Sequence, residues 1–126
     1  MMELVTPLNL NTDSEIVKKQ MEREIQLWIE QLDYVSLEAD RLAKIASNKI
    51  GDKEIRDALL DKINDNIILS NELYSHRNSL INYSECDELE CDLYYIELHQ
   101  KVCQKYLRHI QEYRELKEHV YLQLLM

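Results

Sequence analysis

Residues 84 to 103 hold most of the side chains in this sequence that could do chemistry. The stretch SECDELECDLYYIELHQKVC contains all three cysteines, a run of acids, a tyrosine pair and one histidine. A metal site on a single helix needs ligands three, four or seven residues apart. At about 100° per residue, Cys86, Cys91 and Cys103 point in three different directions. We therefore predict no metal centre on this helix. Separately, we interpret the three cysteines as unpaired thiols, which suit a reducing cytoplasm.

A cluster of charged residues is the second chemical feature. Arg77 lies in the middle of an apolar stripe, and Glu88, Asp92 and His99 lie between two apolar flanks of the next predicted helix. A charge on an apolar face is costly to bury unless it is paired. If a tight hairpin closes near Tyr83, Arg77 comes level with position 90, within one turn of both acids. We predict an ion pair from Arg77 to Asp92 or Glu88, which either fixes the helix register or forms a polar ligand pocket with His99.

The composition argues against several classes of function. Phosphate-binding loops and strained nucleophile turns need several glycines, and Gly51 is the only one. The formal charge of −9, without a basic run, argues against nucleic-acid binding. No apolar run approaches the roughly 20 residues of a membrane span, and the first residues lack the basic region of a secretory signal. We expect no catalytic residues, no cofactor, no nucleic-acid partner and no membrane contact, and we expect a cytoplasmic protein.

Three long helices must position these residues. Thr12 and Glu15 form a capping box that predicts the start of the first helix, and Gly51 followed by Asp52 predicts its end and the cap of the second. A heptad stripe in the first helix comprises Met21, Ile25, Trp28, Leu32, Val35, Ala39, Leu42 and Ala46. The apolar side of the second helix comprises Ile55, Leu59, Ile63, Ile67, Leu73, Tyr74, Leu80 and Ile81.

Ser84 with Asp87 predicts the start of a third helix that runs to the last residue. Two short connections make neighbouring helices antiparallel, so we predict an all-α, up-down-up bundle of three long helices. A two-helix hairpin that dimerises into a larger bundle is the alternative. Residues 1–12 are expected to be a flexible segment, and residues 13–126 a single domain.

Two stretches carry a family resemblance. WIEQLDYVSLEADRL in the first helix and YLRHIQEYRELKEHVYLQLL near the end resemble a group of small, uncharacterised helical proteins found in Bacteroidetes. The resemblance covers about a third of the chain and implies a helical bundle. It supplies no activity, ligand or catalytic residue.

The carboxyl end is the predicted interaction surface. With tight connections the first and third helices are offset by about 66 residues, so we predict that Tyr106 and Tyr113 pack over an alanine patch formed by Ala39, Ala43 and Ala46. About ten terminal residues would then project beyond the bundle. The exposed apolar residues of this projection would be Val120, Tyr121, Leu124 and Leu125. We predict a non-enzymatic protein–protein interaction or scaffolding module that binds another protein or itself, with a homodimer as the simplest form. The alternatives are a ligand- or metal-binding bundle that uses Arg77, Asp92 and His99, and an acidic regulator that covers a basic partner surface.

Overall fold

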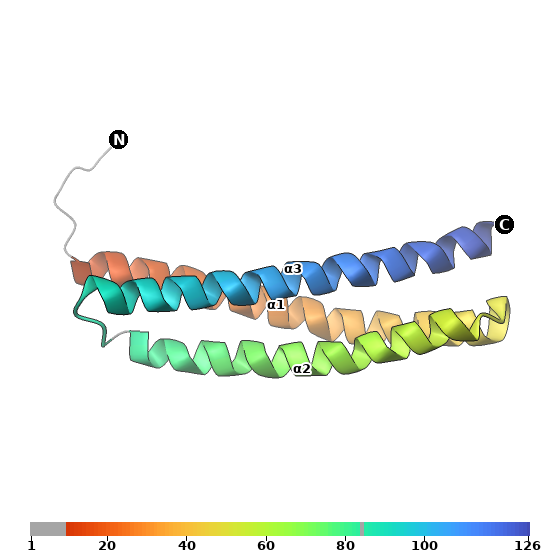
Figure 1. The fold of residues 1–126 in the computed structure, drawn as a ribbon, viewed down its shortest axis with the longest axis horizontal. Coiled ribbons are helices and arrows are strands. Elements are labelled where there is room, and N and C mark those ends of the chain that lie inside the picture. The colour runs from red at the N-terminus through yellow and green to blue at the C-terminus, as the bar shows by residue number, and fades with distance from the viewer. Residues whose placement is uncertain (1–9, 84) are drawn as a thin grey trace.

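Three long helices lie side by side along the molecule (Figure 1). The computed structural model describes residues 10–83 and 85–126. Its elements are α1 (Leu10–Ile45), the π-helical segment η1 (Ala46–Ile50), α2 (Lys53–Tyr83) and α3 (Leu89–Leu125). These described ranges contain no strand, and the α1–α2 turn lies at the same end as the carboxyl terminus. The predicted all-α, up-down-up bundle is confirmed.

The turn between α1 and α2 forms as its sequence predicts. Gly51 adopts the left-handed conformation, with φ 74° and ψ 23°, and its N–H donates to the carbonyl of Ala46. A side chain at this φ would be strained, which explains why the single glycine of the chain lies here. Asp52 then caps α2, because its Oδ1 accepts a hydrogen bond of 3.0 Å from the backbone N–H of Ile55.

The heptad stripe of α1 supplies most of the core. Seven of its eight predicted residues are buried, and Trp28 packs against the core while partly exposed. From α2 the buried apolar residues are Ile55, Leu59, Leu69, Leu73, Leu80 and Tyr83, and from α3 they are Val102, Ile110, Tyr113 and Val120. α1 packs most extensively against α2, and α3 lies across both.

The apolar side predicted for α2 is divided in the structure. Its predicted members Ile55, Leu59, Leu73 and Leu80 are buried, whereas Ile67, Tyr74 and Ile81 are exposed. At about 100° per residue the exposed set lies roughly a quarter of a turn from the buried set. The prediction of one continuous core face on α2 was therefore wrong.

The connection between α2 and α3 is longer than the sequence pattern predicts. α3 begins at Leu89, and the residue before it, Glu88, has an extended backbone without a side-chain cap. The predicted start at Ser84 and Asp87 was wrong in its position, since Asp87 precedes the helix; Ser84 itself lies outside the described residues. A later start moves every α3 residue along the bundle relative to α1 and α2.

The true offset between α1 and α3 is about 75 residues, not 66. Two contacts fix it: Glu24 meets His99 and Glu38 meets Tyr113, each pair 75 residues apart in sequence. Tyr106 consequently stacks on Trp28, with ring centroids 5.3 Å apart, rather than on the alanine patch.

The later start of α3 also removes the predicted overhang at the carboxyl end. Gln123 Nε2 donates to Asp52 Oδ2 at 3.1 Å, so α3 ends almost level with the α1–α2 turn. A projection of about ten residues was therefore a wrong prediction.

Two predictions concern the amino terminus. The side chain of Thr12 lies outside the described part of the chain, so the capping box stays a prediction. The same holds for most of the flexible segment predicted over residues 1–12, although α1 already includes Leu10. In the described ranges, none of the helices combines the length and the apolar character needed to cross a bilayer.

Candidate functional site

A hydrogen-bonded chain of three side chains, which we call the histidine layer, crosses the bundle. His76 of α2 and His99 of α3 meet through Nε2 and Nδ1 at 2.9 Å, and His99 Nε2 lies 2.8 Å from Glu24 Oε1 of α1. Both histidines are buried. Trp28 stacks on the His99 ring with centroids 5.0 Å apart. The layer thus ties all three helices together at one level.

The hydrogen bonds of the histidine layer determine where its protons lie. The carboxylate of Glu24 can only accept, so His99 Nε2–H donates to it and, while the ring is neutral, His99 Nδ1 accepts from His76 Nε2–H. His76 Nδ1 is then a bare acceptor, buried without a partner among the described residues. Burial lowers the pKa of His76 to about 4, and the neighbouring His99 contributes. A proton added at Nδ1 would also have no hydrogen-bond acceptor, which likewise lowers the pKa of His76.

A second buried chain, the asparagine layer, lies closer to the α1–α2 turn. Asn66 Nδ2 donates to the Leu32 carbonyl at 2.6 Å and to Ser36 Oγ at 2.7 Å, while Asn66 Oδ1 lies 2.8 Å from His109 Nε2. His109 therefore donates from Nε2. Burial lowers its pKa, and the charge of Lys62 adds to this effect.

A third chain, the tyrosine layer, links α1 to the far part of α3. The hydroxyl of Tyr113 donates to Glu38, and the ammonium of Lys117 lies 2.9 Å from the same carboxylate. Burial alone would raise the pKa of Glu38, but the bonds from Tyr113 and Lys117 outweigh it and lower this pKa. Burial and the adjacent carboxylate raise the pKa of Tyr113 well above its usual value. Apart from His76 Nδ1, the buried polar groups of the three layers are hydrogen-bonded, and such contacts are of the kind that select one helix register.

The ion-pair cluster predicted around Arg77 does not form. Arg77 Nη1 donates to Gln26 of α1 at 2.8 Å, and its guanidinium lies 4.9 Å from the Tyr74 ring centroid. Because α3 is shifted along the bundle, His99 rather than Asp92 or Glu88 lies beside His76, the residue before Arg77 in α2. No ion pair joins Arg77 to Asp92 or Glu88 within the described ranges.

The remaining members of that cluster have separate surroundings. Glu88 is exposed at the start of α3. Asp92 is half-buried, and its Oδ1 has no hydrogen-bond partner among the residues described. Asp92 lies near Tyr83, whose pKa is raised first by burial and then by this negative charge. Only His99 of the four predicted residues belongs to a buried polar chain.

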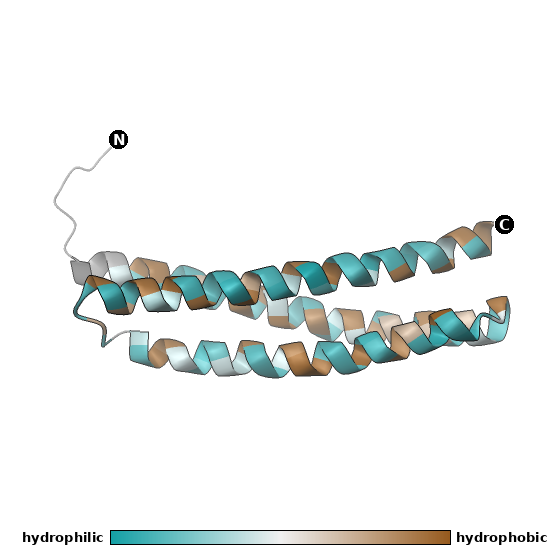
Figure 2. Cartoon of the chain, viewed as in Figure 1, coloured by the Kyte–Doolittle hydropathy of each residue, from teal (hydrophilic) through white to brown (hydrophobic). Residues whose placement is uncertain are grey.

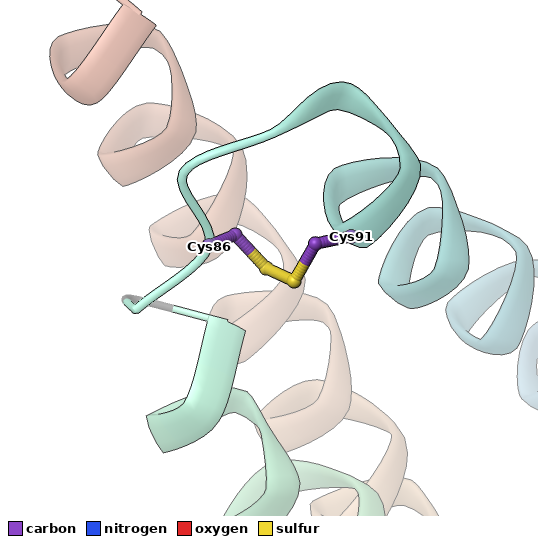
Figure 3. Close-up of a disulfide and its surroundings, with 2 residues drawn as sticks. All are labelled: Cys86 and Cys91. Atoms are coloured by element: carbon purple, nitrogen blue, oxygen red, sulfur yellow. A yellow bond between two sulfur atoms is a disulfide. The ribbon is translucent and has the colours of Figure 1, made fainter.

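The prediction of three free thiols was also wrong. Cys86 and Cys91 form a disulfide with a Cα–Cα distance of 5.5 Å, and Cys103 is the free cysteine. Figure 3 shows the bridge closing the connection after α2 onto the first turn of α3. The prediction failed because Cys86 precedes α3 rather than lying on it, so its thiol can reach Cys91 in the first turn of that helix.

The predicted interaction surface at the carboxyl end is only partly exposed. Tyr121, Leu124 and Leu125 are exposed, but Val120 is completely buried. Val120 belongs to the core because α3 ends level with the α1–α2 turn rather than beyond it. This surface is therefore reduced to the side chains of the last helical turns.

A larger exposed apolar surface lies on α2, which we call the α2 stripe. It consists of four residues at seven-residue steps, each with 42 to 67 % of its surface exposed: Leu60, Ile67, Tyr74 and Ile81. In Figure 2, hydrophobic segments recur among hydrophilic ones along α2. A seven-residue repeat keeps these side chains on one line along the helix, as in the contact line of a coiled coil.

Charge is distributed unevenly around α2. Its five acids lie within an arc of about 80° at 100° per residue: Glu54, Asp57, Asp61, Asp65 and Glu72. The α2 stripe lies about 130° away from the centre of this arc. The stripe therefore carries no acid of α2, and Asp40 of α1, which lines a hollow together with Leu60, is paired with Lys44 at 3.0 Å. Such a surface can be covered without burying an unpaired acid.

Sequence reasoning missed several residues of the polar layers, and a signal for them exists. Asn66 occurs at seven-residue steps among the core residues Leu59 and Leu73, and His109 occurs likewise between Val102 and Leu116. A polar residue in a heptad line of buried apolar residues indicates a buried polar contact. Glu24 and Glu38 carry no comparable signal, because their partners depend on the register of α3.

The arrangement offers limited chemistry. The histidine layer can hold and orient one proton between two rings, but its free nitrogen, His76 Nδ1, is buried out of reach of a substrate. Within the described ranges, no group of three or more His, Cys, Asp or Glu side chains converges to hold a metal ion. Comparisons with protein-family models, with curated proteins and with solved structures find no match to this chain.

Proposed function

We propose that this chain is a non-enzymatic protein–protein interaction module in which a rigid three-helix bundle presents the α2 stripe to a partner helix. The observation that carries the proposal is the stripe itself: four exposed apolar residues at seven-residue steps along a line of α2 that contains no carboxylate. Exposed apolar surface in a line of this length is typical of an interaction site.

The buried polar layers support this role. They fix the relative positions of the helices, so the stripe is presented on a rigid element rather than on a loop. A helix laid along it would contact residues at steps of seven, as in helix-in-groove recognition.

The α2 stripe is a different surface from the interaction surface predicted at the carboxyl end of α3. Tyr121, Leu124 and Leu125 cover little more than one turn of α3, whereas the α2 stripe covers about six turns, from Leu60 to Ile81. We therefore assign the main contact to α2. The cytoplasmic location expected from free thiols loses that support, since disulfides persist mainly in oxidising compartments.

Two adjacent isoleucines give a matched test. Ile67 and Ile68 have similar exposures, 52 and 60 %, but only Ile67 belongs to the stripe. Ile67→Glu should abolish capture of the partner protein in an affinity pull-down, while Ile68→Glu should retain it. Equal capture by both variants would refute the assignment of function to this surface.

A further inference from the structure

We propose that the partner of the α2 stripe is α2 of a second copy of this chain, packed antiparallel about a two-fold axis near Ser70 and Asn71. This inference rests on the proposed function and names its partner. The stripe is symmetric about the midpoint between these two residues, a property that a two-fold contact requires because the same surface must serve both copies. Antiparallel pairing then places Leu60 against Ile81 of the second copy and Ile67 against Tyr74 of the second copy.

The polar residues beside the stripe fit the same arrangement. Asn64, Asn71 and Asn78 also recur at seven-residue steps and are exposed. Their amides both donate and accept hydrogen bonds, so they can pair across a two-fold axis without leaving a charge unpaired. Asn71 would lie at the axis opposite Ser70 of the second copy.

The charges at the two ends of the stripe favour an antiparallel partner. Lys53 and Arg56 precede the stripe on the same side of α2. When each residue advances 100° around the helix axis, Lys53 and Arg56 lie at about 260° and 200°, and the four stripe residues lie between about 180° and 240°. Glu85, Asp87 and Glu88 are exposed and follow its other end. Antiparallel packing brings Lys53 of one copy beside the acidic segment that follows Tyr83 of the other, whereas parallel packing would bring like charges together; Arg56 already pairs with Asp57 of its own helix at 2.9 Å.

The rest of the bundle leaves this surface open. His76, which contacts α3, lies about 170° around α2 from the centre of the stripe, so α3 does not cover it. α1 borders the stripe and adds Leu37, which is exposed and follows Ser36, a contact of Asn66. Two copies would thus pair mainly through α2. The charged surface of α1, where Asp40 lines the same hollow as Leu60, would form the rim, and α3 of each copy would lie outside.

The available area approaches that of a standard dimer interface. The stripe spans 21 residues, about 32 Å at 1.5 Å per residue, and a face two helices wide measures roughly 20 Å. Length times width gives a flat area of roughly 640 Å², to which the uneven surface of the side chains would add. This approaches the about 800 Å² that each partner buries in a standard interface. α2 alone would provide only about half of this.

Sedimentation velocity on the full chain tests the dimer. We expect the wild type to sediment at twice the monomer mass of 15.1 kDa at micromolar concentration. Ile67→Glu buries two carboxylates per dimer and should raise the dimer dissociation constant at least about 100-fold, whereas Ile68→Glu should change it by less than about threefold. Both positions are exposed, so both variants should keep the wild-type helical circular dichroism.

Cysteine cross-linking in a Cys103→Ser background tests the orientation. Antiparallel pairing predicts that Leu60→Cys does not cross-link to itself but cross-links to Ile81→Cys when the two variants are mixed. A parallel dimer would instead cross-link Leu60→Cys to itself and would overturn the proposed arrangement.

The outcomes separate this inference from the proposed function. A wild-type chain that stays monomeric up to about 100 μM, or a dimer that Ile67→Glu leaves intact, overturns the second copy as partner. The interaction module itself fails only if Ile67→Glu and Ile68→Glu also capture the same proteins.

Discussion

Acidification from pH 7 to pH 4.5 should destabilise the bundle, with His76 as a principal cause. Its ring is buried, its Nε2–H is committed to His99, and its Nδ1 has no acceptor among the described residues. The folded chain therefore resists protonation of His76, whereas the unfolded chain does not. Between the unfolded pKa of 6.5 and the folded pKa of about 4, the unfolded state binds more protons, so the free energy of unfolding falls as the pH drops through this window.

The size of the effect follows from these two pKa values. One pKa unit corresponds to about 1.4 kcal/mol, so the interval between 6.5 and about 4 sets an upper limit of about 3 kcal/mol. By pH 4.5 the His76 ring would contribute a loss of about 2 kcal/mol. The pKa of His109 is also lowered by burial, so its layer adds a loss of the same sign.

Urea denaturation at pH 7 and pH 4.5 measures this loss, with His76→Gln as the matched variant. Glutamine can keep a hydrogen bond to His99 but does not titrate. The wild type should lose about 2 kcal/mol more than His76→Gln between the two pH values, while carboxylate protonation affects both proteins alike. Parallel pH dependences in the two proteins would refute the reasoning about the histidine layer.

Three further predictions concern stability. Asn66→Ala should cost about 2 to 4 kcal/mol in urea denaturation, because it leaves His109 and the Leu32 carbonyl without their partner; a cost below about 1 kcal/mol would contradict the asparagine layer. Tyr113→Phe should cost only about 1 kcal/mol, since Lys117 still neutralises Glu38, and a loss above about 3 kcal/mol would show a larger role for the hydroxyl. Reduction of the disulfide, which joins residues five apart, should cost about 2 kcal/mol and lower the melting temperature of the wild type and of a Cys103→Ser control alike; an unchanged melting temperature would contradict a native bridge.

The parts of the fold that depend on local signals could be predicted from the sequence. The heptad stripe of α1, the left-handed Gly51 and the Asp52 cap each depend on residues within a few positions, and all three are confirmed. The start predicted at Ser84 was wrong because the disulfide and the extended backbone of Glu88 precede a helix that begins at Leu89. Neither feature has a capping pattern that could be recognised in the sequence.

The candidate site could not be predicted because its contacts depend on register. An error of a few residues in the length of the α2–α3 connection shifts the expected position of α3 by more than a turn. As a result, Arg77 bonds to Gln26 instead of the predicted acids, and His99 contacts His76 and Glu24, which were not predicted as its partners. The α2 stripe was missed for a different reason. Ile67 and Leu73 fit the same pattern of apolar spacing, and only packing against α1 and α3 determines which of them is buried.

Carbene footprinting of the full chain, read by mass spectrometry, tests the central claim most directly, because it compares apolar side chains in the free and the bound state. Binding of the partner should reduce labelling at Leu60, Ile67, Tyr74 and Ile81 and leave Ile68 unchanged. Protection confined to Leu124 and Leu125, with the α2 stripe labelled as in the free chain, would contradict the assignment of the interaction surface to α2.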